Sequence, residues 1–222
     1  MLTQTVHTGS ISVWTVFFMR KLWKQLVICL LLVCTFWCGT LLADRQQLSR
    51  ELIRLHVVAN SDSAEDQSVK LLVRDAVTES LQSALADVRD VEQAKAYLQE
   101  NLPKIQSVAE DVLAAAGVDM TATVSLCRET FDKRVYDTFT LPAGVYESLR
   151  ITLGAGEGRN WWCVVFPSLC LSATGEGFED VAAGAGFSDA LNGALTGEEG
   201  YEIRFFLLDV LGRVENIFFL EE

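Results

Sequence analysis

The chain has 222 residues, of which half are hydrophobic and 22% are charged. This length fits one folded domain with an additional segment, and the apolar content is sufficient for a core, which excludes a disordered or low-complexity chain. The 30 acidic residues outnumber the 18 basic ones, and the net charge of -12 argues against a nucleic-acid-binding protein, whose affinity rests on clustered Lys and Arg.

The first predicted element is an apolar segment near the N-terminus. Residues 26–43 carry no charge and follow a basic cluster at residues 20–24. At about 1.5 Å per residue the uncharged run is about 27 Å long, close to what a hydrocarbon core of roughly 30 Å requires, and the basic flank keeps the N-terminal end in the cytoplasm. Residues 20–43 are therefore expected to form a signal-anchor transmembrane helix or a signal peptide. The large Leu41 at the possible cleavage site favours the anchor.

The segments on either side of this run differ in character. Residues 1–19 carry no charge, and we expect them to be a cytoplasmic extension or foreign to the native protein, with Met19 as the native start. Three of the basic residues and none of the acidic ones precede residue 44, so residues 44–222 carry a net charge of -15. We expect this acidic part to be exported.

The pattern of apolar residues in the exported part predicts a mixture of strands and helices. β-Branched and large apolar residues predict strands at 52–59, 121–128, 135–140, 147–153 and 161–166. Apolar residues at spacings of three and four predict helices at 63–86, 90–102, 103–116, 188–195 and 201–214. Pro103 fits the first turn of a helix, so we expect a helix boundary there. Residues 171–200 are rich in Gly and Ala and are expected to form a surface excursion. Residues 217–220 are expected to form an extended tail. The elements together predict a single α+β domain outside the membrane.

Three cysteines, Cys127, Cys163 and Cys170, lie in the exported part. If the last predicted strand turns at Pro167, Cys163 faces Cys170 with the two Cβ atoms about 4.5 to 5.5 Å apart, close to what a disulfide requires. We therefore expect this pair to be bonded. Two buried thiols in a core strand are the alternative interpretation.

Few residues of the chain suggest an active site. His56 is the only histidine of the exported part, which excludes a multi-histidine metal site, and we expect no metal and no cofactor. A hydrolase could combine His56, Ser61 and Asp62, but a trio within one short stretch matches no nucleophile elbow. The glycine-rich stretch 154–158 lacks a following Lys-Ser/Thr and leads into a strand, so it predicts no phosphate loop. We expect neither catalysis nor a small-molecule substrate.

Two neighbouring tryptophans, Trp161 and Trp162, lie in the most apolar of the predicted strands. Successive side chains of a strand point to opposite faces, so only one of the two rings can easily enter the core. The other is expected to face a layer, a loop or a partner, since tryptophan is enriched at interaction hot spots.

Two long motifs follow one another along the chain. The first comprises LIRLHVVANSDS at 52–63, EDQ at 65–67, Lys70 and VRDAV at 73–77. The second comprises LPAG at 141–144, YESLRI at 146–151, Gly156, Gly158, NWWCV at 160–164, Phe166, Pro167, Leu169 and Cys170. Both motifs resemble the signatures of the stage II sporulation protein R family. The resemblance covers about residues 50–171, so Cys127, the residues before Met19 and the Gly/Ala-rich excursion inherit no role from it.

The resemblance implies an intercompartmental signal of endospore-forming bacteria. Members of this family are exported from the forespore into the space between the two compartments. There they activate a membrane-embedded aspartic protease of the mother-cell membrane, which cleaves the precursor of sigma-E. The residues that we expect to contact this protease are Asn60, Asp62, Arg74, Asn160, Trp161 and Trp162.

Each of these residues also has a purely structural interpretation. Asp62 and Arg74 could form an internal ion pair, and Asn60 and Asn160 could shape turns. Two other functions stay open beside that of a signal. One is an exported cell-envelope hydrolase that uses the histidine and serine of the trio, and the other is a structural envelope protein that acts by oligomerising.

Overall fold

The computed structural model describes residues 13–167 and 187–221. The chain divides into two compact units, residues 1–42 and 43–222, and each is described by itself. Helix α1 (Val13–Glu51) supplies the described residues of the first unit and the start of the second. It is long and apolar enough to cross a membrane, and the window that meets this test is almost entirely exposed. The helix is consistent with a signal anchor or a signal peptide.

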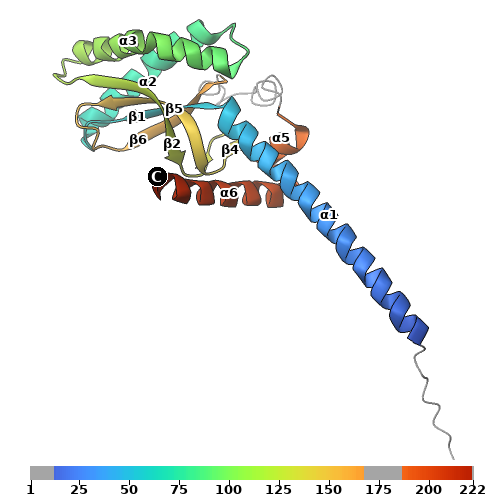
Figure 1. Ribbon diagram of the computed structural model, residues 1–222. Coiled ribbons are helices and arrows are strands. Elements are labelled where there is room, and N and C mark those ends of the chain that lie inside the picture. The colour runs from blue at the N-terminus through green and yellow to red at the C-terminus, as the bar shows by residue number, and fades with distance from the viewer. Residues whose placement is uncertain (1–12, 168–186, 222) are drawn as a thin grey trace, which may run out of the picture. The chain divides into compact units, whose positions relative to one another are not determined.

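The second unit is built on a four-stranded mixed sheet (Figure 1). Its strands are β1 (Ile53–Val58), β2 (Ala122–Phe131), β5 (Gly144–Leu153) and β6 (Asn160–Phe166), in the spatial order β2-β5-β1-β6. β1 pairs in parallel with β5 and antiparallel with β6, while β5 pairs antiparallel with β2. β1 is therefore an inner strand, and all six of its residues are buried.

Helices α2 (Ala64–Leu85) and α3 (Val91–Ala115) cover one face of the sheet (Figure 1). The side chain of Ser63 accepts a hydrogen bond from the first turn of α2 and caps the helix where the sequence predicts its start. Leu55 of β1 and its register partner Leu149 of β5 are fully buried under the helices. Burying one such side chain is worth about 1.5 to 3 kcal/mol, so this face holds the main core.

The opposite face of the sheet carries a hairpin and the C-terminal helix (Figure 1). The hairpin strands are β3 (Arg134–Val135) and β4 (Thr140–Leu141), and the last helices are α5 (Asp189–Thr196) and α6 (Glu202–Glu221). α6 approaches the junction of β4 and β5 so closely that a Cβ on Gly212 would overlap the carbonyl group of Ala143. The second face is thus covered by different elements from the first.

The helix boundary predicted at Pro103 is wrong, because α3 continues through it. Leu98 before the proline and Ile105 after it are both buried in the main core. This shared packing outweighs the backbone hydrogen bond that a proline inside a helix forgoes.

The strand predicted at 135–140 is also wrong, because the chain reverses within it. The backbone N–H of Tyr136 donates to the carbonyl oxygen of Phe139 at 2.8 Å, and the two rings stack with centroids 4.7 Å apart. The segment therefore forms the turn of the β3–β4 hairpin. Asp137 is a turn-forming residue, and its preference for a turn outweighs the strand preference of its β-branched neighbours.

The C-terminal segment is helical for longer than the sequence predicts. Residues 217–220 belong to α6 and form no extended tail, since no Gly or Pro follows Gly212 to end the helix. The helix predicted at 188–195 is confirmed as α5, with Ser188 as its N-cap. Most of the 171–200 excursion lies outside the described residues. The α+β fold class behind one N-terminal apolar helix is confirmed.

Candidate functional site

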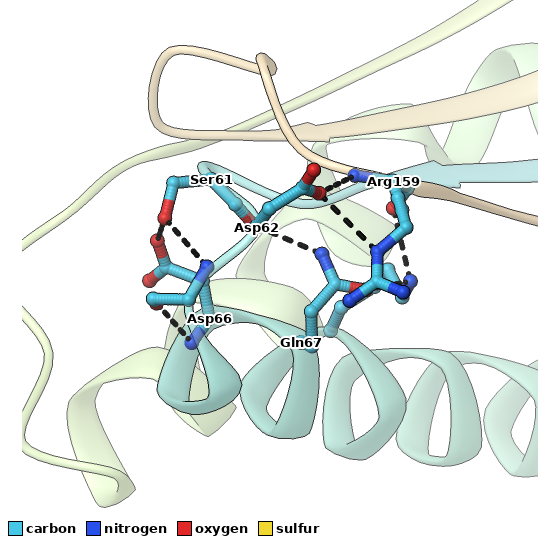
Figure 2. A network of polar contacts seen from close by, with 7 residues as sticks. Ser61, Asp62, Asp66, Gln67 and Arg159 are labelled. Carbon is cyan, nitrogen blue, oxygen red and sulfur yellow. Dashed lines mark hydrogen bonds and ion pairs between the residues drawn. The ribbon is translucent and has the colours of Figure 1, made fainter.

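The loop between β1 and α2 is organised around the carboxylate of Asp66 in the first turn of α2 (Figure 2). The side-chain amide of Asn60 and the hydroxyl of Ser61 both donate to Oδ2 of Asp66. The backbone N–H of Asp66 in turn donates to Ser63 Oγ at 3.1 Å. The hydrogen bonds from Ser61 and Asn60 lower the pKa of Asp66, so the carboxylate that fixes this loop is ionised at neutral pH.

Asn60 also binds the neighbouring loop between β5 and β6. Its side-chain oxygen accepts from the backbone N–H of Ala155 at 2.9 Å, and its carbonyl oxygen accepts from the N–H of Glu157 at 3.1 Å. Both ends of the Asn60 amide are therefore used inside the protein. The structure gives Asn60 the turn-shaping role that the sequence analysis held as the alternative to partner contact.

A second set of bonds, centred on Arg159, joins the same two loops (Figure 2). Its backbone N–H donates to Asp62 Oδ1 at 2.7 Å, and its guanidinium lies 3.4 Å from the same oxygen. Its carbonyl oxygen accepts from Nζ of Lys70, a buried lysine that also donates to Gln67. Burial and the nearby charge of Arg159 lower the pKa of Lys70. The two loops thus form one rigid platform at this edge of the sheet.

An exposed aromatic side chain lies beside this platform. Trp161 of β6 is 38% exposed, and the guanidinium of Arg74 from α2 sits 4.3 Å from its ring centroid. Arg74 pairs with its neighbour Asp75, so the internal ion pair considered between Arg74 and Asp62 does not form. Instead, Asp62 is paired with Arg159. We name the group Asp62, Arg74, Arg159 and Trp161 the Trp161 surface. Asn160, exposed at the start of β6, alternates with Trp161 along the strand, and its contact with a partner stays a prediction.

Trp162 lies on the other face of the sheet, as the alternation of strand residues predicts. Its ring stacks on His56 with centroids 3.9 Å apart, and it meets Phe131 edge-on at 5.0 Å. The guanidinium of Arg134 lies 5.0 Å from the Trp162 ring centroid. Trp162 is therefore a packing residue beneath the β3–β4 hairpin and no part of the Trp161 surface.

The trio considered for a hydrolase is not brought together. His56 Nδ1 lies 3.0 Å from a carboxylate oxygen of Glu129, on the same face as Trp162. Ser61 is bonded to Asp66, and Asp62 to Arg159, so no two members of the trio are hydrogen-bonded to each other. Among the described residues there is also no group of three or more His, Cys, Asp or Glu side chains that could hold a metal ion.

A buried arginine is the main feature that sequence reasoning missed. Arg54 of β1 is fully buried, with its guanidinium 4.0 Å from the ring centroid of Phe131 and 5.2 Å from that of Tyr146. Its Nη2 donates to the hydroxyl of Tyr136, while Nε and Nη1 have no hydrogen-bond partner among the residues that the structure describes. The alternation of residues in β1 could have indicated that Arg54 faces the second side of the sheet, because Arg54 and His56 occupy the positions between the apolar core residues. Rings replace carboxylates as the partners of this cation.

Acid is expected to destabilise this second face through Glu129. Burial opposes the ionisation of Glu129, but the hydrogen bond from His56 and the charge of Arg150 bring its pKa below the usual value. A lowered folded-state pKa stabilises the fold above the unfolded value, near 4.3, and this stabilisation is lost as the pH falls through the folded-state pKa. Urea unfolding from about pH 6 to about pH 3 should show this loss. Glu129→Gln should flatten the dependence, whereas Glu157→Gln on the exposed loop should keep it.

The two described cysteines of the second unit lie in β2 and β6. Cys163 is buried at 6% exposure and is disulfide-bonded, while Cys127 is a free thiol whose pKa is raised by burial. Cys170 lies outside the described residues, so its pairing with Cys163 stays a prediction.

Comparison with known proteins relates this fold to sporulation. The family model described as stage II sporulation protein R matches residues 49–176, which include β1, α2, the two joined loops and the Trp161 surface. The stage II sporulation protein R of Bacillus subtilis (strain 168) is 38% identical over 120 residues. The matched part is 54% of this chain and 54% of that protein, so the chain spans about half the length of the curated relative it matches. No solved structure matches the chain. The chain belongs to the stage II sporulation protein R family.

Proposed function

We propose that this chain is an exported sporulation signal that activates a membrane-embedded aspartic protease through the Trp161 surface. Its family membership supports a role in sporulation, and the N-terminal apolar helix is consistent with export or anchoring. The activated protease would cleave the precursor of sigma-E in the mother cell. On this proposal the chain is the signal and performs no catalysis of its own.

The observation that carries the proposal is the exposure of Trp161 within an ordered charged surface. The Arg74 guanidinium stacks on one side of the ring, and the joined loops hold the neighbouring Arg159 and Asp62 in place. A large aromatic ring that is already ordered loses little conformational entropy when a partner covers it. Aromatic and arginine side chains are also the residue types that dominate binding energy at interfaces.

Loss of Trp161 is expected to abolish signalling without unfolding the domain. Trp161→Ala should reduce cleavage of the sigma-E precursor by about 30-fold, the effect of losing ~2 kcal/mol at a hot spot. The measurement is precursor cleavage in a non-sporulating host that expresses the full chain, the protease and the precursor. The midpoint of thermal unfolding should fall, because the ring is only 38% exposed and packs against Arg74, but the chain should stay folded and exported.

Two comparisons make this experiment decisive. Val135→Ala removes another exposed apolar side chain, from the β3–β4 hairpin, and should leave cleavage unchanged. Arg74→Lys keeps the charge but not the planar stacking on Trp161 and should give an intermediate loss. Normal cleavage with a folded, exported Trp161→Ala chain would remove the Trp161 surface from the mechanism. Cleavage that occurs without the chain would remove the signalling function itself.

A further inference from the structure

The C-terminal helix α6 presents its apolar residues outward. Its exposed large hydrophobic side chains, spaced mostly three or four positions apart, are Ile203, Phe206, Val210, Val214, Ile217, Phe218 and Leu220. Phe206 is 63% and Phe218 64% exposed. A row of this length on a helix is far more than the scattered apolar residues of an ordinary surface. A patch of this kind marks a binding site for another apolar surface.

The polar side chains of α6 are used on its other side, against its own domain. Asp209 accepts from the backbone N–H of Ala143 at 2.9 Å, and Asn216 donates to the carbonyl oxygen of Phe131 at 3.0 Å. Glu215 pairs with Arg45. The helix is thus fixed to its own domain by these polar contacts and by the buried Leu208, which leaves its exposed apolar side free for something outside the domain.

The start of α6 is tied to the point where the chain leaves its uncharged segment. Arg204, in the first turn of α6, forms a largely buried ion pair with Asp44. Asp44 is the residue that directly follows the uncharged run 26–43. If that run crosses a bilayer, covalent connectivity alone places Asp44 at the membrane surface. The ion pair then holds the first turn of α6 at the same level.

We propose that the apolar side of α6 docks onto the outer surface of the bilayer in which the N-terminal segment is anchored. The acidic domain, with its net charge of -15 beyond residue 43, gives no attraction to anionic lipids. Docking therefore rests on burial of apolar side chains at the level of the lipid headgroups, as for other interfacial helices. It needs no anionic lipid and is insensitive to salt. The anchored domain is thereby held in a fixed orientation on the membrane.

The test is lipid photolabelling of the full chain in phosphatidylcholine vesicles that contain a diazirine-bearing acyl chain. Mass spectrometry then maps the labelled residues. We expect label within 26–43 and also on the apolar side of α6, unchanged between about 0.1 M and about 1 M salt. The double variant Phe206→Gln, Phe218→Gln should lower the α6 label at least about tenfold, since two large apolar side chains would no longer enter the lipid. The 26–43 label should stay the same.

Two results would overturn this inference. Label confined to residues 26–43 in the unmodified chain would show that α6 does not reach the lipid. A chemical cross-link between the α6 helices of two copies, with no lipid label there, would assign the apolar side to a second copy. The vesicles contain no protease, so neither result depends on the proposed signalling function. The exposed Leu72 of α2, on the other face of the sheet, is the internal control and should stay unlabelled.

Discussion

Gly212→Val is expected to separate α6 from the sheet and to destabilise the domain by roughly 3 kcal/mol, at the upper end of the overpacking range. A Cβ at this position would overlap the carbonyl oxygen and carbon of Ala143. Both are backbone atoms, and no flexible side chain can move aside to make room. The helix would have to move away, and the hydrogen bond from Ala143 N–H to Asp209 would be lost with it.

The free energy of unfolding of the full chain in mild detergent measures this effect. Hydrogen exchange at the Ala143 amide reports the separation directly, because that amide loses its acceptor when α6 moves away. Val214→Ala, on the outward side of the same helix, is the matched control and should change the stability by less than about 0.5 kcal/mol. An unchanged stability for Gly212→Val would mean that α6 contributes little to the fold.

Local patterns were enough to predict the elements around the Trp161 surface. The apolar run of β1 and the start of α2 at residue 63 each depend on a few neighbouring residues, and both are found as predicted, with Ser63 as the N-cap. The opposite orientations of Trp161 and Trp162 follow from the two-residue period of a strand in the same way. Structural features that depend on a few neighbouring residues, and on one dominant property of those residues, could be predicted.

The arrangement of the sheet could not be predicted from such patterns. β1 and β5 are parallel neighbours although more than 80 residues separate them, and no local signal specifies that partner. The same holds for Arg54, whose burial depends on rings contributed by β2 and β5. Local propensity also gave a wrong helix boundary at Pro103, because packing against the sheet outweighs the tendency of proline to interrupt a helix.

The expected contact residues divide according to how their side chains are already used. As a residue type, Asn60 suits both a turn and a contact with a partner. Only the atomic contacts show that both ends of its side-chain amide are hydrogen-bonded within the protein. Trp162 is likewise occupied, by His56 and Phe131. Asp62, Arg74, Asn160 and Trp161 remain at the surface and keep their expected role as a proposal, and partner contact by Asn60 and Trp162 likewise stays a prediction. The sequence could name the segment but could not separate its structural residues from its exposed ones.

Gly158→Ala is expected to separate the two joined loops and to abolish signalling indirectly. A Cβ on Gly158 would overlap the backbone carbonyl of Ser61, so the β5–β6 loop could no longer lie against the β1–α2 loop. The hydrogen bond from Gly158 N–H to the carbonyl oxygen of Ala59, now 2.9 Å, would be lost, and the bond between Arg159 and Asp62 would be strained. The expected cost is about 2 to 3 kcal/mol of stability, together with loss of precursor cleavage.

Measuring stability and cleavage together separates platform residues from contact residues. Glu157→Ala alters an exposed side chain one residue earlier and keeps its backbone bond to Asn60, so both quantities should stay near those of the unmodified chain. Gly158→Ala should lower both, whereas Trp161→Ala should lower cleavage more than its loss of stability explains. Normal cleavage by a destabilised Gly158→Ala chain would contradict the need for a rigid platform. The Trp161 surface would then act without help from the loops that order it, and the entropic argument for its binding would fail.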